Sequence, residues 1–321
     1  MNSHTLRRGV AALLTAASLV GAITQASAET LRIGYQKYGS LVLLRADGGL
    51  ERRLAEHGID VSWTEFPAGP QLLEGLNVGA VDFGTTGETP PVFAQAAGAD
   101  LLYVAHEPPA PLSEAILLPK DSPIQSVADL KDKRVAFNKG SNVHYLLVRA
   151  LASAGLSITD VNSIFLPPAD ARAAFERGSV DAWVIWDPFQ AAAEAQLNAR
   201  TLVNGEDLVS NHQFYLSTRD FADRHPDAIR ILIEEIDRIG QWTRANPDAA
   251  ADQVAPLLGL AHDITRTALA RQSYGPQLLS PEVVAAQQRI ADTFFELKLI
   301  PRKLDITSVI WTAPQAPDRN Q

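Results

Sequence analysis

One sequence pattern occurs twice in this chain, and both copies include the sequence Gly-x-Val-Asp. The copies cover residues 66–83 and 165–182, and a fainter similarity precedes each of them, at residues 32–40 and 134–142. The spacing of 99 residues, from Phe66 to Phe165, is too long for the unit of a solenoid. The repeat therefore predicts two similar lobes, and a cleft between two lobes is a common place for a ligand.

Each lobe is predicted to begin with a strand that passes through a polar turn into a helix. Strand 31–35 leads to helix 41–46 in the first lobe, and strand 135–137 leads to helix 143–154 in the second. Ser40, and either Ser141 or Asn142, are residue types that cap helices. A further strand, a Pro-rich turn, a short helix and another strand follow in both lobes. This alternation predicts an α/β fold with two lobes, each a mostly parallel sheet flanked by helices.

The strands after Gly-x-Val-Asp end close to two prolines, Pro90 and Pro188. Proline is favoured at the first position of a helix, which makes Thr89 and Asp187 the predicted N-caps. Ligands of open α/β sheets lie beyond the carboxyl ends of the strands. We therefore expect four strand-to-helix turns, two from each lobe, to face the cleft.

The chain is predicted to cross between the lobes twice, near residues 113–118 and 214–217. The predicted lobes and the helices of the C-terminal tail have these bounds: residues 29–115 with 216–321 for the first lobe, 116–215 for the second, and helices 226–246, 247–258 and 281–297. The tail is expected to pack on the first lobe.

Residues 1–28 have the pattern of a cleavable signal peptide. Arg7-Arg8 precedes an apolar stretch that ends before Ala26-Ser27-Ala28. This stretch is shorter than the ~20 residues that span a bilayer, and the arginine pair leaves Sec and twin-arginine export both open. The chain has no Cys, so it has no thiolate nucleophile, disulfide or lipid-anchor site. We expect export to the periplasm.

Composition excludes several classes of function. Without the two arginines of the signal peptide, 26 basic residues stand against 37 acidic ones, a net charge of −11. Such a balance argues against nucleic acid or anionic membranes as partners. The seven histidines are scattered, and the sequence has no G-x-S-x-G, H-E-x-x-H or G-x-x-x-x-G-K-[ST] motif. We expect a binding protein rather than an enzyme, without a metal or cofactor.

The predicted helix starts supply candidate ligand contacts, because unpaired backbone N–H groups and the helix dipole attract small anions. The candidates are neutral donors and residues whose backbone a ligand approaches: Gln36, Thr86, Gly87, Gly140, Ser141, Asn142 and His144. For Ser141 and Asn142 the alternative is simple helix capping. For Gln36 and His144 the alternative is turn or surface polarity.

Four further side chains are candidates. Arg172 is predicted to face the cleft and pair with an oxyanion, or else to bridge to Asp170 or Glu176. Trp186 is predicted to cover an aliphatic tail, with core packing as the alternative. Glu88 and Asp187 occupy equivalent repeat positions. Three roles stay open for them: capping helices, binding a second part of the ligand, or bridging the closed lobes.

Several segments resemble the aliphatic sulfonate-binding proteins of bacterial ABC importers. The resemblance extends from Leu31 to about Trp311 and rests on residues 66–71, 86–100, 107–109, 127–131, 139–141, 168–175 and 186–188. Nitrate-, taurine- and thiamine-precursor-binding proteins share the Gly-x-Val-Asp skeleton. Glu107-Pro-Pro, and Thr-Gly-Glu-Thr-Pro-Pro combined with Trp-Asp-Pro, are more specific to the sulfonate group.

The resemblance implies a monomeric periplasmic-binding-protein fold that closes about a hinge and serves sulfur metabolism. It would bind an alkanesulfonate and deliver it to a membrane permease without catalysis. The alternatives are a receptor for taurine, nitrate or another oxyanion, and an enzyme of the thiamine-precursor kind on the same scaffold.

Overall fold

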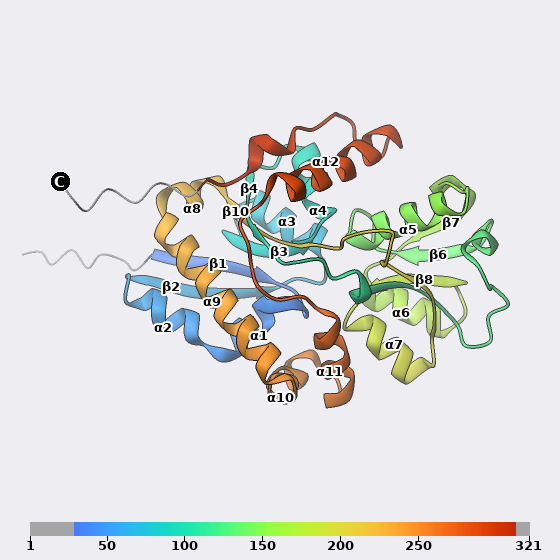
Figure 1. Ribbon diagram of the computed structural model, residues 1–321, viewed down its shortest axis with the longest axis horizontal. Coiled ribbons are helices and arrows are strands. Elements are labelled where there is room, and N and C mark those ends of the chain that lie inside the picture. Colours follow the sequence, from blue (N-terminus) through green and yellow to red (C-terminus); the bar gives the residue numbers. More distant parts are fainter. Residues whose placement is uncertain (1–28, 313–321) are drawn as a thin grey trace, which may run out of the picture.

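A computed structural model of the chain describes residues 29–312 and shows the two predicted α/β lobes side by side (Figure 1). The predicted signal peptide, residues 1–28, lies outside the described residues, as do residues 313–321. Each lobe is built on a five-stranded sheet. Over residues 29–312, no helix combines the length and apolar character that crossing a bilayer requires.

The sheet of the first lobe consists of β1 (Glu29–Tyr35), β2 (Ile59–Glu65), β3 (Phe83–Gly87), β4 (Leu101–His106) and β10 (Gln213–Thr218). Its helices are α1 (Gly39–Asp47), α2 (Gly49–Ala55), α3 (Gly69–Asn77), α4 (Pro90–Ala97), α8 (Arg219–Arg224), α9 (Pro226–Ala245), α10 (Pro247–Leu258), α11 (His262–Arg271), α12 (Pro281–Glu296) and the 3-10 turn Ile306–Val309. The strand order is β2-β1-β3-β10-β4.

The sheet of the second lobe consists of β5 (Glu114–Leu118), β6 (Arg134–Phe137), β7 (Asn162–Phe165), β8 (Ala182–Trp186) and β9 (Arg200–Asn204). Its helices are α5 (Asn142–Ser153), α6 (Pro168–Glu176), α7 (Phe189–Leu197) and the 3-10 turns Pro111–Ser113, Val127–Leu130 and Ile158–Asp160. The strand order, β7-β6-β8-β5-β9, repeats that of the first sheet.

The fourth strand of each sheet runs against its neighbours. β10 is antiparallel to β3 and β4, and β5 is antiparallel to β8 and β9. These two strands are the segments predicted as crossings, and this prediction was wrong because both are apolar and buried in the middle of a sheet. The chain passes between the sheets at residues 107–113 and 205–212. We place the lobe boundaries in these two crossing segments.

The repeated Gly-x-Val-Asp ties together two strands in each lobe. In the first lobe, Asp82 Oδ2 accepts from the backbone N and Nε of Arg32 (2.9 Å each), and Arg32 also donates to the Gly79 carbonyl. In the second lobe, Asp181 Oδ2 accepts from the backbone N (2.8 Å) and Nε (3.1 Å) of Arg134. The motif therefore fixes the start of β3 against β1 and of β8 against β6, at the strand ends away from the helix starts.

Replacing Asp82 by alanine is expected to lower the free energy of unfolding by about 2–3 kcal/mol, because hydrogen bonds to charged groups contribute ~1.5–3 kcal/mol. Asp181→Ala should cost about 1 kcal/mol, because the Asp181 side chain is 31% exposed and that of Asp82 only 10%. Urea unfolding measures both values. Asp220→Ala, which removes an exposed pair with Arg224, is the control; a loss at Asp82 no larger than this control would contradict the structural role.

The predicted helical tail is confirmed, and it packs on the first lobe. α9 supplies Ile229, Leu232 and Ile236 to the core around β1 and α1. The sequence did not reveal α2 or α11. α11 is rich in polar residues and buries only three of its side chains, so its apolar pattern is weak.

Two predicted serine caps bond elsewhere. α1 begins at Gly39, so Ser40 lies inside the helix and its hydroxyl donates to Glu107 Oε1 (2.9 Å). Ser141 occupies the N-cap position of α5, but its hydroxyl donates to the Asn138 carbonyl (2.7 Å).

The prolines Pro90 and Pro188 take different positions at the starts of their helices, α4 and α7. Pro90 is the first residue of α4, as predicted. α7 begins at Phe189, so Pro188 takes the N-cap position that was predicted for Asp187. Asp187 still serves this helix start, because its Oδ1 accepts from the backbone N of Ala191 (2.9 Å).

Candidate functional site

A small cavity lies between the lobes, where strand ends of both sheets meet the first turn of α5. It is lined by Gln36, Tyr38, Gly69, Gly87, Pro90, Ser113, Asn142, Trp186, Gln213 and Gln272, none of which carries a charge. The cavity measures ≈ 10 Å³, about the space that one water molecule needs. The lobes are therefore closed on each other, and an organic ligand enters only if they part.

Closure brings Gly87 against Asn142. A Cβ atom placed on Gly87 would lie 2.7 Å from the Cβ of Asn142, closer than real Cβ contacts. Glycine at the end of β3 thus permits the first turn of α5 to approach the backbone of the other lobe.

Three of the predicted side-chain donors, those of Gln36, Thr86 and Asn142, are bonded within the protein. Gln36 Nε2 donates to the Thr85 carbonyl (3.0 Å), and the Thr86 hydroxyl donates to the Gly87 carbonyl (3.0 Å). Asn142 Nδ2 donates to both Glu114 Oε2 (2.5 Å) and Asn211 Oδ1 (3.2 Å).

The orientation of the Asn142 amide is fixed by Asn211. Asn211 Nδ2 donates to the Ala110 carbonyl and to the Ser113 hydroxyl (3.0 Å each), so its Oδ1 must accept. Both Asn142 donor hydrogens are then used. An anion at this helix start would meet the backbone N–H groups of the first turn rather than the Asn142 side chain.

Buried carboxyl groups surround the two crossing segments. Glu88, Glu107 and Glu114 are each at most 2% exposed. Burial raises the pKa of Glu88 and of Glu107 to about 7. Burial, and next the charge of Glu88, raise the pKa of Glu114 well above its ordinary value.

Glu107 connects the first crossing segment to the first lobe. Its Oε1 accepts from the hydroxyls of Ser40 (2.9 Å) and Tyr215 (2.6 Å). Its carbonyl accepts from Nδ1 of His106 (2.9 Å) and of His212 (2.8 Å), and since a carbonyl only accepts, both rings carry a proton on Nδ1. Glu107-Pro-Pro, which carried much of the resemblance, is thus a junction between the two crossings and the first sheet.

Glu107→Gln is expected to change how stability depends on pH. An acid whose pKa is higher in the folded state stabilises the fold below its unfolded pKa, and this contribution is lost as the pH rises through the folded pKa. For a rise from 4.5 to about 7, the stability of the natural protein relative to the variant should fall by about 3 kcal/mol between pH 4.5 and 7.5. Chemical unfolding at several pH values measures this difference, and a flat difference would contradict the burial argument.

The structure brings four of the predicted site residues to the cavity: Gln36, Gly87, Asn142 and Trp186. Trp186 also belongs to the core of the second lobe and packs edge-on against Phe189. It therefore both lines the cavity and packs in the core, the two roles that were predicted as alternatives. Thr86 and Ser141 lie next to lining residues in the chain, and Gly140 lies two positions before Asn142, but none of the three lines the cavity itself.

Arg172 and His144 lie outside the cavity lining. Arg172 Nε pairs with Glu176 Oε1 (2.8 Å), which is the predicted alternative. His144 packs among Phe93, Phe137 and Phe294. Burial lowers the His144 pKa to about 4, and its Nδ1 accepts from the backbone N of Gly140 (3.3 Å). A direct ligand contact for these two residues stays a prediction.

Glu88 and Asp187 both turn to partners away from the cavity. Glu88 Oε2 accepts from the backbone N of His212 in the second crossing (3.2 Å). Asp187 Oδ2 lies 3.5 Å from Arg271 of α11, which also pairs with Glu194 of α7 (2.6 Å). Asp187 thus takes part in a bridge between the lobes.

Six lining residues were not predicted: Tyr38, Gly69, Pro90, Ser113, Gln213 and Gln272. Tyr38 and Pro90 belong to the strand-to-helix turns that were expected to face the cleft, so the same sequence pattern could have identified them. Ser113 is the last residue of the first crossing segment, Gln213 follows the second, and Gln272 follows the unrecognised α11. No local motif marks these three.

Comparison with known proteins agrees with this architecture. The family model described as NMT1/THI5 like matches residues 54–250. An aliphatic sulfonates-binding protein of Escherichia coli (strain K12) is 45% identical over 97% of this chain and 98% of its own length. A protein of the same description from Bacillus subtilis (strain 168) is 35% identical, covering 87% of this chain and 85% of its own.

Solved structures give the same result. The alkanesulfonate-binding protein SsuA from Xanthomonas axonopodis pv. citri, bound to MOPS, superposes with a TM-score of 0.86 at 43% identity, covering 89% of this chain and 99% of its own. The two lobes predicted from the repeat, and the periplasmic-binding-protein fold that the resemblance implied, are thereby confirmed. With this overall fold and nearly its whole length shared with these relatives, the chain belongs to the family of aliphatic sulfonate-binding proteins.

Proposed function

We propose that this protein is a periplasmic receptor that binds an alkanesulfonate between its lobes and delivers it to an ABC permease, without catalysis. The observation that carries the proposal is the uncharged lining of the interlobe cavity at the start of α5. The similarity to sulfonate-binding proteins supports the same class of ligand.

A sulfonate suits such a lining because it is anionic at any physiological pH and offers three acceptor oxygens. Backbone N–H groups at the α5 start stabilise its charge. The amides of Gln213 and Gln272 and the indole of Trp186 line the same space and supply further donors. Neutral donors hold an anion without the strong field of a lysine cluster, which favours release to the permease.

The ligand's tail would meet the rings of Tyr38, Pro90 and Trp186, which come from both lobes. Contacts from both sides favour the closed arrangement of the lobes once ligand is present. Closure about the two crossing segments is the motion that such a receptor requires.

Taurine is a less suitable ligand for this cavity. Its ammonium group would need a carboxylate, and none lines the cavity. The three acids next to lining residues are already engaged: Glu88 by His212, Glu114 by Asn142 and Asp187 by Arg271. We therefore infer a preference for sulfonates with uncharged tails.

Calorimetric titration of the mature protein tests the proposal. Methane- to hexanesulfonate, taurine, sulfate and nitrate form the panel. We expect micromolar or tighter binding of an alkanesulfonate, about −8 kcal/mol or more favourable, and binding of taurine at least tenfold weaker. Clear binding of nitrate or sulfate with no heat from any sulfonate would refute the proposed ligand class.

Trp186→Ala is expected to weaken long-chain sulfonates more than short ones. Each buried methylene contributes ~0.8 kcal/mol, so the loss should grow by up to about fourfold per methylene in contact with the indole. The ratio of dissociation constants along the series measures this dependence. Equal losses for all chain lengths would show that Trp186 does not touch the tail.

A further inference from the structure

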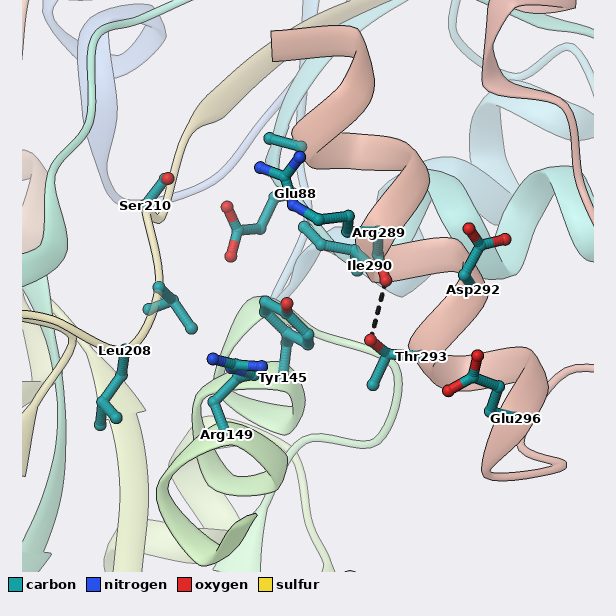
Figure 2. Close-up of a pocket in the computed structure, with 12 residues that line it drawn as sticks. Glu88, Tyr145, Arg149, Leu208, Ser210, Arg289, Ile290, Asp292, Thr293 and Glu296 are labelled. Atoms are coloured by element: carbon teal, nitrogen blue, oxygen red, sulfur yellow. Dashed lines mark hydrogen bonds between the residues drawn. The ribbon is translucent and has the colours of Figure 1, made fainter. Parts of the chain in front are cut away.

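A second and much larger cavity, of ≈ 540 Å³, lies between α5, α12 and the second crossing segment (Figure 2). This α5–α12 cavity is separate from the interlobe cavity described above, because the two share no lining residue. α12 belongs to the first lobe, where Gln287 donates to the Tyr103 hydroxyl of β4 (2.9 Å), whereas α5 belongs to the second lobe. Its volume is in the range of cavities that hold small organic ligands.

Two arginines from different lobes line this cavity, Arg149 on α5 and Arg289 on α12. Figure 2 shows the Tyr145 ring between their side chains. The one hydrogen bond drawn between lining residues joins the Thr293 hydroxyl to the Arg289 carbonyl (2.8 Å), so neither guanidinium is bonded to another lining residue. Asp292 and Glu296 also line the cavity, but they do so on the side of α12 that is turned away from Tyr145.

A buried carboxyl group without a full set of partners also faces this cavity. Glu88 is 2% exposed, and Oε1 has no hydrogen-bond partner within residues 29–312. Figure 2 shows its carboxyl directed to the space between Ser210 and Tyr145. Burial raises the Glu88 pKa to about 7, so in slightly acidic solution Oε1 carries a proton that it can donate to an anion.

Charges from three elements act on the Tyr145 hydroxyl. Burial and then the charge of Glu88 raise its pKa, while Arg149, hydrogen bonding with Thr293, and Arg289 act in the opposite direction. The hydroxyl therefore stays protonated and lies between the two cations as a donor. Leu208, Val209 and Ile290 add apolar surface to the same cavity.

We propose that the α5–α12 cavity is a second ligand site, which takes a small organic dianion with one oxyanion at Arg149 and the other at Arg289. Guanidinium groups pair well with carboxylates and sulfonates. Two cations on opposite sides of Tyr145 fit two separated anionic groups better than one. The apolar residues between them suit an aliphatic spacer. A ligand held in this way would contact both lobes at a place distinct from the sulfonate cavity.

Titration of the mature protein with adipate at pH 6.5 and constant ionic strength tests this site, with hexanesulfonate saturating the interlobe cavity. We expect adipate to bind at least tenfold more tightly than hexanoate. Arg149→Gln and Arg289→Gln should each weaken adipate at least tenfold. Arg230→Gln, which removes an exposed arginine paired with Asp227 on α9, is the matched control and should leave adipate binding unchanged.

Four results would overturn the proposal: no heat with adipate, equal binding of hexanoate, equal losses in the Arg230 control, or adipate binding that hexanesulfonate abolishes and the arginine variants leave intact. The last result would place adipate in the sulfonate cavity. Thermal melting of each variant confirms that it is folded. Because hexanesulfonate binding is measured first and alone, failure of the proposed receptor function is recognised independently of failure at this second site.

Discussion

Replacing Gly87 by alanine is expected to weaken sulfonate binding about 10- to 100-fold while the free protein keeps its stability. Gly87 lies at the end of β3, and its backbone is not in the left-handed region, so alanine fits there when the lobes are apart. In the closed arrangement the added methyl would lie 2.7 Å from the Asn142 Cβ and 2.9 Å from its Cγ. Overpacking of this kind costs about 1–3 kcal/mol, and the cost falls on the closed state alone.

Calorimetry measures the loss of affinity, and thermal melting of the ligand-free protein verifies the fold. Asn142→Gly removes the atoms that the new methyl would strike, so the double variant should bind more tightly than Gly87→Ala alone. Such a recovery measures direct coupling between the two positions. If Gly87→Ala binds sulfonate as the natural protein does, ligand-bound lobes do not approach each other as they do here.

Arg271→Met should weaken sulfonate binding by more than about 100-fold at pH 8.5 and by less than about tenfold at pH 6, because removing one partner of a buried ion pair costs about 3–5 kcal/mol. Arg271 bridges from α11 to Asp187 and Glu194 in the other lobe, and Asp187 is fully buried. Burial holds the Asp187 pKa at about 7, and Arg271 opposes this rise. Without Arg271 the pKa rises further, so at pH 6 Asp187 is protonated and leaves no unpaired charge.

Arg266→Met is the matched control, because Arg266 lies on the same helix but pairs with an exposed aspartate of its own lobe, Asp248. Its affinity for sulfonate should stay within about twofold of the natural value at both pH values, since exposed pairs contribute little. A loss in Arg271→Met that is the same at pH 6 and pH 8.5 would contradict the role of the buried Asp187 charge.

The architecture was predictable from the sequence because the repeated residues hold strands of each sheet together, whereas the ligand site depends on other residues. Gly-x-Val-Asp recurs because each copy binds an arginine of the neighbouring strand, Arg32 or Arg134, and so aligns two parallel strands. The turns that follow these strands could then be assigned to the cleft. Gly87, Asn142 and Trp186 were found in this way.

The contacts inside the site were not predictable, because the partners lie far apart in the chain. Asn142 is a plausible anion donor until Glu114 and Asn211, 28 and 69 residues away, are seen to occupy its amide hydrogens. Arg172 had equally good local and distant partners, and the local one forms. Gln272 enters the cavity behind a helix whose polar sequence gives little indication that it exists.

The position of β10 determines the order in which the lobes can be completed. All five strands of the second sheet come from the continuous segment 114–204, whereas β4 bonds within the first sheet only to β10, whose residues follow that segment. When the chain emerges with its amino terminus first, the edges of β3 and β4 stay exposed until β10 (Gln213–Thr218) has emerged and pairs with both. The lobe that starts the chain therefore finishes folding last, and any factor that keeps the emerging chain from aggregating has to act until the later lobe has been made.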